Sequence, residues 1–292
     1  MIRLALRVRR QDAELALAEL LALAPSGVEE VEIDDSFVEY AVYGAPGELP
    51  QLPDLRAAAG SAFVEVSTSE LPDDWSERWK RFHQPIVIDG VGEGVPSLRL
   101  RPPWEPSVDL PNTTEIVIDP GQAFGTGAHH TTRMCLELLL ALASQEDKRG
   151  PVIDLGCGSG VLAIAAAHLG FAPVLGLDHE PESVQATLDN ARANGVDVRG
   201  QRFDLRRQSL RSIQSGPQGR PPPLLLLANL VRPLLLDLAV SLLDPPAHLI
   251  ASGLLREEAD EVAAAFHDRL GLRECRRRHS GEWAALWLSV LL

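Results

Sequence analysis

Cysteine is scarce in this sequence of 292 residues, and its three cysteines, Cys135, Cys157 and Cys275, stand far apart. No C-x-x-C pair and no clustered histidines accompany them, so the sequence predicts neither a disulfide framework nor a zinc site. We therefore expect a functional site without a metal ion. A chain without disulfides suits a reducing compartment, which makes the cytoplasm the expected location.

A long hydrophobic run is missing as well. The most apolar stretch, residues 224–243, is interrupted by Arg232, Pro233 and Asp237, which excludes a helix that spans a lipid bilayer. Arginines at positions 3 and 7 divide the apolar beginning of the chain, so no signal peptide is predicted. We expect a soluble protein with no membrane partner.

Basic residues are also few in number compared with acidic ones. The 27 lysines and arginines are outnumbered by 41 aspartates and glutamates, which gives a formal net charge of -14 at pH 7. A chain this acidic lacks a general basic surface for a polyanionic backbone, so direct nucleic-acid binding is not expected. A basic protein is the partner that the charge favours.

The length predicts two domains at roughly 150 residues each, and the pattern of apolar residues separates them. Residues 1–68 combine period-two segments, as in Ile2, Leu4, Leu6 and Val8, with helical spacing. The predicted order is strand 2–9, helix 11–24, strands 28–34 and 37–42, helix 52–60 and strand 62–67. This β-α-β-β-α-β order is that of a ferredoxin-like α+β domain.

A linker with a hairpin is predicted for residues 69–112, and a larger α/β domain for residues 113–292. Trp75 and Trp79 in the linker are spaced to share one helical face, and we expect them to pack the domain junction. Beyond residue 131, strands and helices alternate, which favours a Rossmann-like parallel sheet covered on both faces. Residues 211–223, rich in Ser, Gly and Pro, are expected to form a loop.

The sharpest motif is the segment VIDLGCGSG at residues 152–160, a buried strand that turns into a helix. Its glycines let the backbone approach a ligand. Val161 stands where dinucleotide enzymes have their third glycine, and an acid, Asp154, precedes the turn. This G-x-G-x-G pattern resembles that of S-adenosylmethionine-dependent methyltransferases. A tight turn without a ligand is the alternative.

Two further acids follow neighbouring strands. Asp178 ends the second predicted strand, where an acid can accept both hydroxyls of a ribose. Asp204, after the third strand, predicted at residues 196–199, can accept from an adenine amino group if the loop register places it there. His179 and Glu180 can approach the adenine, although a solvated turn is the simpler interpretation for both.

A polar, glycine-rich loop at residues 119–132, DPGQAFGTGAHHTT, precedes the helix that leads into the sheet. Its backbone amides and hydroxyls are available to a ligand, and Thr131 or Thr132 can cap the following helix. The alternative is a capped loop in which His129 has only a structural hydrogen bond.

The pattern F-G-T-G-x-H-x-T-T followed by D-L-G-C-G-S-G resembles the bacterial PrmA family, which methylates the large-subunit ribosomal protein L-eleven. The resemblance covers the chain from about Leu71 onward and includes Asp74-Trp75, Ala228-Asn229-Leu230 and Gly281-Glu282-Trp283. It implies a class I methyltransferase domain joined by a mobile linker to an N-terminal domain that recognises the substrate protein. Ala128, Glu180, Arg232 and the insertion 211–223 depart from the family pattern.

The resemblance implies S-adenosylmethionine as cofactor and methyl transfer to lysine side-chain or N-terminal amines. Asn229, at the end of the fourth strand, can orient the acceptor amine, and its alternative role is to cap the next helix. The predicted cofactor-binding residues are Phe124, Thr126, Gly127, His129, Asp154, Gly156, Gly158, Gly160, Asp178, Asp204 and Asn229. A lysine methyltransferase with another protein substrate and an inactive cofactor-binding module are the alternative functions.

Overall fold

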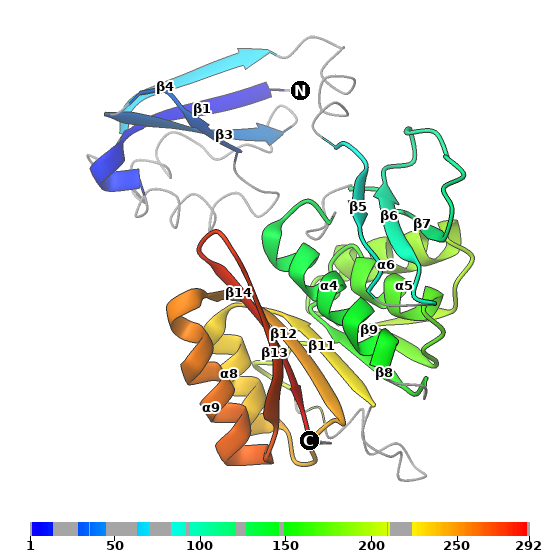
Figure 1. Ribbon diagram of the computed structural model, residues 1–292. Helices are drawn as coiled ribbons and strands as arrows, with labels where there is room; N and C mark the ends of the chain where they lie inside the picture. Colours follow the sequence, from blue (N-terminus) through cyan, green and yellow to red (C-terminus); the bar gives the residue numbers. More distant parts are fainter. Residues whose placement is uncertain are drawn as a thin grey trace. The chain divides into compact units, whose positions relative to one another are not determined.

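The computed structural model describes residues 2–13, 29–34, 36–44, 63–70, 83–91, 94–120, 127–145, 149–208, 210 and 224–290. The chain divides into two compact units, Met1–Phe82 and His83–Leu292, both drawn in Figure 1. Most of the predicted helix 11–24, the predicted helix 52–60, the two linker tryptophans, the loop 211–223, Phe124 and Thr126 lie outside the described residues.

The first unit contains a four-stranded antiparallel sheet in the order β2-β3-β1-β4. The strands are β1 (Ile2–Arg9), which a short 3-10 turn follows, β2 (Glu29–Glu32), β3 (Phe37–Gly44) and β4 (Phe63–Glu70). Leu4, Leu6 and Val8 are buried, as the period-two pattern predicts. This strand order and direction confirm the ferredoxin-like arrangement.

The second unit is built on a seven-stranded sheet in the order β10-β9-β8-β11-β12-β14-β13. The strands are β8 (Val152–Leu155), β9 (Val174–Asp178), β10 (Val198–Arg202), β11 (Leu225–Asn229), β12 (His248–Leu255), β13 (Arg273–Ser280) and β14 (Trp283–Ser289). The first five are parallel, β14 runs antiparallel to them, and β13, which is antiparallel to β14, runs in the direction of the first five. The direction of chain crossover reverses between β8 and β11, which makes this boundary the switch point of the sheet.

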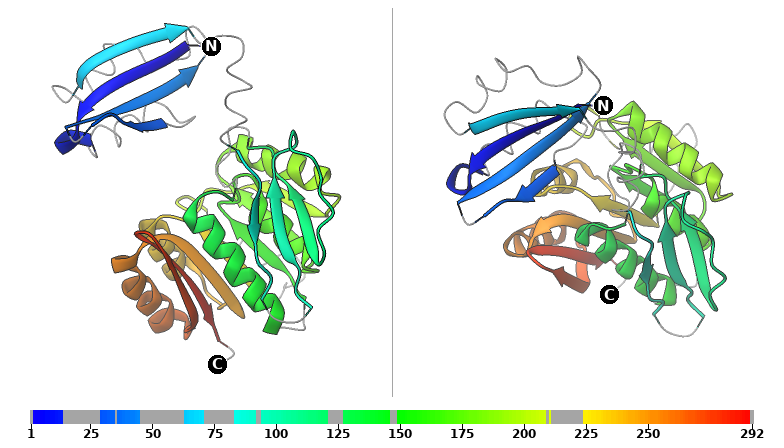
Figure 2. Two further views of the ribbon diagram at one scale, coloured as in Figure 1. Left: turned by 45° about the horizontal axis from the view of Figure 1, so that its top comes forward. Right: turned by 90° about the horizontal axis from the view of Figure 1, so that it is seen from above.

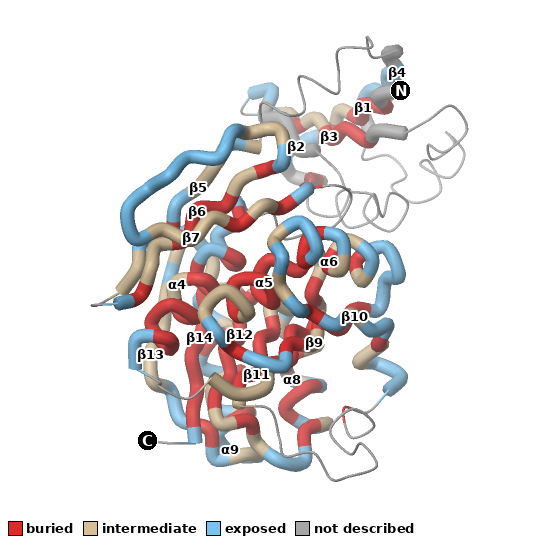
Figure 3. Tube along the Cα trace, turned by 90° about the vertical axis from the view of Figure 1, so that its right-hand side faces the viewer, coloured by how far each residue is buried: buried red, intermediate tan, exposed pale blue. Residues whose placement is uncertain are grey.

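Helices cover both faces of this sheet (Figure 1). Side chains of α4 (His130–Gln145) and α5 (Val161–His168) join one buried cluster, and those of α8 (Arg232–Ser241) and α9 (Ala259–Leu270) join another. Successive residues of β11 alternate between the clusters, because neighbouring side chains of a strand point to opposite faces. Buried residues therefore run along the central strands, as Figure 3 shows, and the predicted doubly covered sheet is confirmed.

A second, smaller sheet stands beside α4 and α5 (Figure 2). It consists of β5 (Ile86–Ile88), β6 (Ser97–Arg101) and β7 (Thr113–Val117), with β6 in the middle. Arg99 of β6 is buried and reaches Glu115 of β7 with a nitrogen-oxygen distance of 2.6 Å. The strands β5 and β6, predicted as part of a linker and hairpin, thus form one sheet with β7 inside the second unit.

The third parallel strand lies later than the sequence predicts. It was expected at 196–199, whereas β10 spans Val198–Arg202. The reason is the end of α6 (Pro181–Ala193), where the backbone N–H of Val196 donates to the carbonyl of Ala191 and closes the helix. Among the described residues, no helix combines the length and the apolar character needed to cross a membrane.

Candidate functional site

A cavity of about 350 Å³ lies at the carboxyl ends of four neighbouring parallel strands, β10, β9, β8 and β11. Its volume falls within the range of small-molecule sites, and it lies beside the switch point, where open α/β sheets bind ligands. The lining residues are Leu155, Gly156, Asp178, His179, Phe203, Asp204, Leu205, Arg206, Arg207, Leu230 and Leu234.

Asp178 connects the end of β9 with the glycine turn after β8. Its Oδ2 accepts the backbone N–H of Gly158 at 3.0 Å, and its Oδ1 accepts that of Glu180 at 3.1 Å. Nδ1 of His179 also lies 3.3 Å from Oδ1. A carboxylate has about four lone-pair positions in all, so acceptor capacity remains for a ligand in the cavity. The structure thus brings together the acid and the turn that the sequence predicted as one site.

Asp154 lies beneath the glycine turn and is 1% exposed. Its Oδ2 accepts the backbone N–H of Ala163, in the first turn of α5, at 3.1 Å. Burial raises the pKa of Asp154 to about 7, and the nearby Asp178 adds to the rise. Asp154 is not among the cavity-lining residues. Through its bond to Ala163 it instead holds the first turn of α5, which follows the glycine turn.

Gly160, the third glycine of the turn, precedes α5 with a φ of 82° and faces α6. A Cβ atom built there would lie 2.9 Å from the Cα atom of Thr187, so only glycine fits between the turn and this helix. Of the three predicted glycines, Gly156 lines the cavity, Gly158 holds Asp178, and Gly160 provides the close helix contact.

Asp204 lines the cavity and also organises the turn that follows β10. Its Oδ1 accepts the backbone N–H of Arg206 at 3.0 Å, and its backbone N–H donates to Oε1 of Gln208 at 2.9 Å. Phe203 donates its own backbone N–H to the carbonyl of Asp178, which places these neighbouring residues beside the end of β9. Contact between Asp204 and an adenine stays a prediction.

Asn229, the last residue of β11, makes hydrogen bonds to the beginning of α4. Its Nδ2 donates to Oγ1 of Thr131 at 3.2 Å and to Oγ1 of Thr132 at 3.3 Å. The helix-cap alternative for Asn229 is wrong, because α8 begins at Arg232 and its N-cap is Val231, with no side-chain cap bond. The two threonines that the sequence offered as caps of α4 instead hold the amide of Asn229.

His129 belongs to the same network. Its Nδ1 lies 2.8 Å from Oγ1 of Thr131, and its ring meets Trp283 edge to face, with 5.2 Å between the ring centroids. Burial, followed by the nearby His130, lowers the pKa of His129. His130 faces elsewhere, with its Nδ1 2.7 Å from Oγ of Ser280. Gly127, also predicted to contact the cofactor, is buried at the described end of this loop.

Arg232, three residues after Asn229, pairs with an acid on α9. Its Nε and Nη2 donate to the two carboxylate oxygens of Glu261, each at 2.6 Å. This two-pronged pairing fixes the guanidinium at the surface. The departure from the family pattern at Arg232 therefore has a local partner and adds no unpaired charge to the site.

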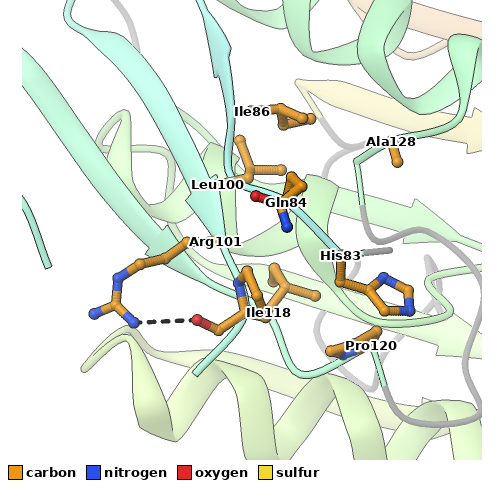
Figure 4. A pocket seen from close by; sticks show the side chains of 9 residues that line it. His83, Gln84, Ile86, Leu100, Arg101, Ile118, Pro120 and Ala128 are labelled. Carbon is orange, nitrogen blue, oxygen red and sulfur yellow. Dashed lines mark hydrogen bonds between the residues drawn. The ribbon is translucent and has the colours of Figure 1, made fainter. Parts of the chain in front are cut away.

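A much smaller cavity of about 20 Å³ lies where the segment before β5 meets the His129 loop (Figure 4). His83 and Ala128 line it from these two segments, and Arg101 lies at its edge with Nη1 donating to the carbonyl of Pro102. Its volume suits a single water molecule and no larger ligand.

Several residues that line the large cavity were not predicted as site residues. Phe203, Leu230 and Leu234 contribute apolar lining, and Arg206 and Arg207 also line the cavity. Their positions depend on where β10 and β11 end, which periodicity fixes only to within a few residues. Within the described ranges, no group of three or more His, Cys, Asp or Glu side chains is placed to hold a metal ion.

The strand order, the single antiparallel strand β14 between β12 and β13, and the cavity at the switch point together define a class I methyltransferase. The family model described as ribosomal protein L11 methyltransferase (PrmA) matches residues 51–289. The chain belongs to this family, which is one of S-adenosylmethionine-dependent methyltransferases. The resemblance drawn from the two loop motifs is thereby confirmed.

Individual relatives carry the same description. The ribosomal protein L11 methyltransferase of Citrifermentans bemidjiense is 40% identical over 201 residues, which cover 67% of this chain and 61% of that protein. The one from Chloroflexus aurantiacus is 37% identical over 236 residues, covering 73% of this chain and 68% of that protein. The chain thus spans about two thirds of the length of these relatives.

A solved structure of a ribosomal protein L11 methylase from Lactobacillus delbrueckii subsp. bulgaricus is also similar. It is 31% identical, with a TM-score of 0.55, and the match covers 66% of this chain and 94% of that one. The likeness supports both the fold and the family.

Proposed function

We propose that this protein is an S-adenosylmethionine-dependent N-methyltransferase that modifies amines of ribosomal protein L11. The observation that carries the proposal is the arrangement at the switch point, where Asp178 faces the cavity and Asn229 precedes the cavity-lining Leu230. Family membership supplies the substrate, since the similar relatives are ribosomal protein L11 methyltransferases.

The cavity suits the proposed cofactor. The acceptor capacity left on Asp178 suits the hydroxyls of a ribose, and Phe203, Leu230 and Leu234 provide apolar surface for an adenine ring. Asp204 is placed to accept from the adenine amino group. When bound, S-adenosylmethionine supplies an electrophilic methyl group on a positively charged sulfur.

Asn229 has the role of orienting the acceptor amine. Its Nδ2 donates to the hydroxyl oxygens of Thr131 and Thr132. The carbonyl oxygen of the amide, Oδ1, is therefore the atom available to accept from the amine hydrogens. A carbonyl oxygen in that position aims the nitrogen lone pair, and such positioning supplies much of the rate of a direct displacement. A lysine amine, with an ordinary pKa near 10.4, becomes a better nucleophile when partial burial lowers its pKa.

The first compact unit has the proposed role of holding the substrate protein. Residues 1–68 were predicted as the recognition domain, 69–112 as a linker and 113–292 as the cofactor domain. With the small sheet of β5, β6 and β7 assigned to the second unit, we place the functional division between Phe82 and His83. A net charge of -14 favours a basic protein substrate, and ribosomal proteins are made in the cytoplasm, where we expect this enzyme to act.

The test uses the full chain, methyl-labelled S-adenosylmethionine and ribosomal proteins from cells that lack their own enzyme of this family. We expect label in L11 and in no other ribosomal protein. Label in a different protein would favour the alternative lysine methyltransferase. Cofactor binding without any labelled protein would favour the inactive binding module.

A further inference from the structure

A continuous set of hydrogen bonds joins His129 to Asn229 through one threonine. Nδ1 of His129 receives the backbone N–H of Thr131 at 3.3 Å and lies 2.8 Å from its hydroxyl oxygen. That same hydroxyl oxygen lies 3.2 Å from Nδ2 of Asn229. The three residues come from the loop before α4, from α4 itself and from the end of β11.

The direction of these bonds follows from counting hydrogens. Because the backbone N–H of Thr131 points at Nδ1 of His129, this nitrogen acts as an acceptor, and the ring proton of neutral histidine lies on Nε2. The hydroxyl of Thr131 has a single hydrogen, which the short contact to Nδ1 uses. Its oxygen can then only accept from Asn229, so the amide must present its NH₂ group to the threonine.

We propose that His129 is a positioning residue that sets the amide orientation of Asn229 through the Thr131 hydroxyl. The inference rests on the proposed function, because the orientation matters for an amine acceptor. With Nδ2 directed at Thr131, Asn229 offers the carbonyl oxygen to the amine. The reverse orientation would set NH₂ donors against the amine hydrogens and misalign the nucleophile.

The surroundings of His129 keep its ring in the orientation that the network needs. Trp283, at the start of β14, packs edge to face against the ring. Burial and His130 lower the pKa of His129, which favours the neutral ring with an accepting Nδ1. A protonated ring would carry a hydrogen on Nδ1 and meet two donors from Thr131, so the network depends on neutral histidine.

The experiment measures single-turnover methyl transfer and cofactor affinity in four variants of the full chain. Thr131→Val and His129→Phe should each slow transfer about tenfold, the effect of losing one hydrogen bond, and this loss of rate should exceed any loss of cofactor affinity. The double variant should be no slower than either single one, because both break the same connection. Thr131→Ser, which keeps the hydroxyl, should restore transfer.

Ser280→Ala is the matched control, since it removes the hydroxyl beside His130 and leaves the His129 network intact. It should transfer methyl groups at the wild-type rate. Wild-type transfer in His129→Phe, or rate losses that multiply in the double variant, would overturn the positioning role.

A second readout is independent of activity. In ¹⁵N-labelled protein, the NH₂ signals of Asn229, identified with Asn229→Ala, should shift in Thr131→Val and in His129→Phe, and stay in place in Ser280→Ala. Unchanged signals in His129→Phe would refute the inference even in an active enzyme. If the signals shift as expected while the wild-type protein methylates no amine, the orientation by His129 stands and the proposed function fails.

Discussion

Asp178 accepts the backbone N–H of Gly158 at 3.0 Å, so the acid at the end of β9 also holds the glycine turn at the end of β8. This bond fixes the ends of two neighbouring strands relative to each other at the site proposed for the cofactor. A ligand that binds Asp178 therefore meets a turn that is already in place, and loss of the carboxylate affects both parts.

Replacement of Asp178 should weaken S-adenosylmethionine binding. Asp178→Ala removes both the ribose acceptors and the bond to Gly158, and we expect an affinity loss of about tenfold to a hundredfold, as for hydrogen bonds to charged groups. Asp178→Asn keeps one acceptor and should lose less. Calorimetric titration measures both. Asp189→Ala, which removes an exposed acid paired with Arg192 on α6, is the control and should bind normally; equal affinity in all three would contradict the assignment.

Asp154 should make the stability of the fold depend on pH. Its pKa rises from 3.8 to about 7 in the folded chain, so between these values the folded state keeps a proton that the unfolded state has lost. Raising the pH through this interval therefore lowers the free energy of unfolding, by up to about 1.4 kcal/mol per pH unit, and no further loss occurs above it.

Urea unfolding of wild-type protein and of Asp154→Asn tests this dependence. The asparagine keeps an acceptor for Ala163 but cannot ionise, so its advantage over wild type should grow from about pH 4 to about pH 7 and then stay constant. Parallel stability curves for the two proteins across this range would show that Asp154 is ionised normally.

Substitution of Gly253 should destabilise the fold more than substitution of a glycine with free space around it. Its φ is 84°, and a Cβ atom would lie 2.5 Å from the carbonyl oxygen of Leu230, next to Asn229. Gly253→Ala should cost about 2–4 kcal/mol of unfolding free energy, from backbone strain and the clash combined, and should slow transfer. Gly271→Ala, at a φ of 70° with nothing within 4 Å, should cost only about 1 kcal/mol. Similar losses in thermal or urea unfolding would count against the close contact.

The sequence predicted the parts of the site that consist of an acid or a glycine turn at the end of a buried strand. Asp178 and the glycine turn follow directly from a buried strand, and the structure joins them as expected. The position of Asp204 relative to the sheet could not be fixed, because the closing of α6 at Val196 moves β10 along the chain. Likewise, no local pattern pairs Asn229 with Thr131, since the contact links segments about a hundred residues apart.

Removal of residues 1–82 should separate recognition from cofactor binding. All the described residues that line the cavity belong to the second compact unit, so this unit should bind S-adenosylmethionine with wild-type affinity. Methylation of L11 at low substrate concentration should be lost, because the proposed recognition unit is gone. A truncated enzyme that methylates L11 with unchanged efficiency would show that the first unit does not hold the substrate.

The most direct test of the account is single-turnover transfer from S-adenosylmethionine to purified L11, followed by mass spectrometry of the intact substrate. The wild-type chain should add mass in steps of one methyl group. Asn229→Ala should bind the cofactor normally and transfer about tenfold or more slowly, because the amine loses the acceptor that aims it. Unmodified L11 after incubation with the wild-type enzyme, or equal rates in the two proteins, would contradict the account.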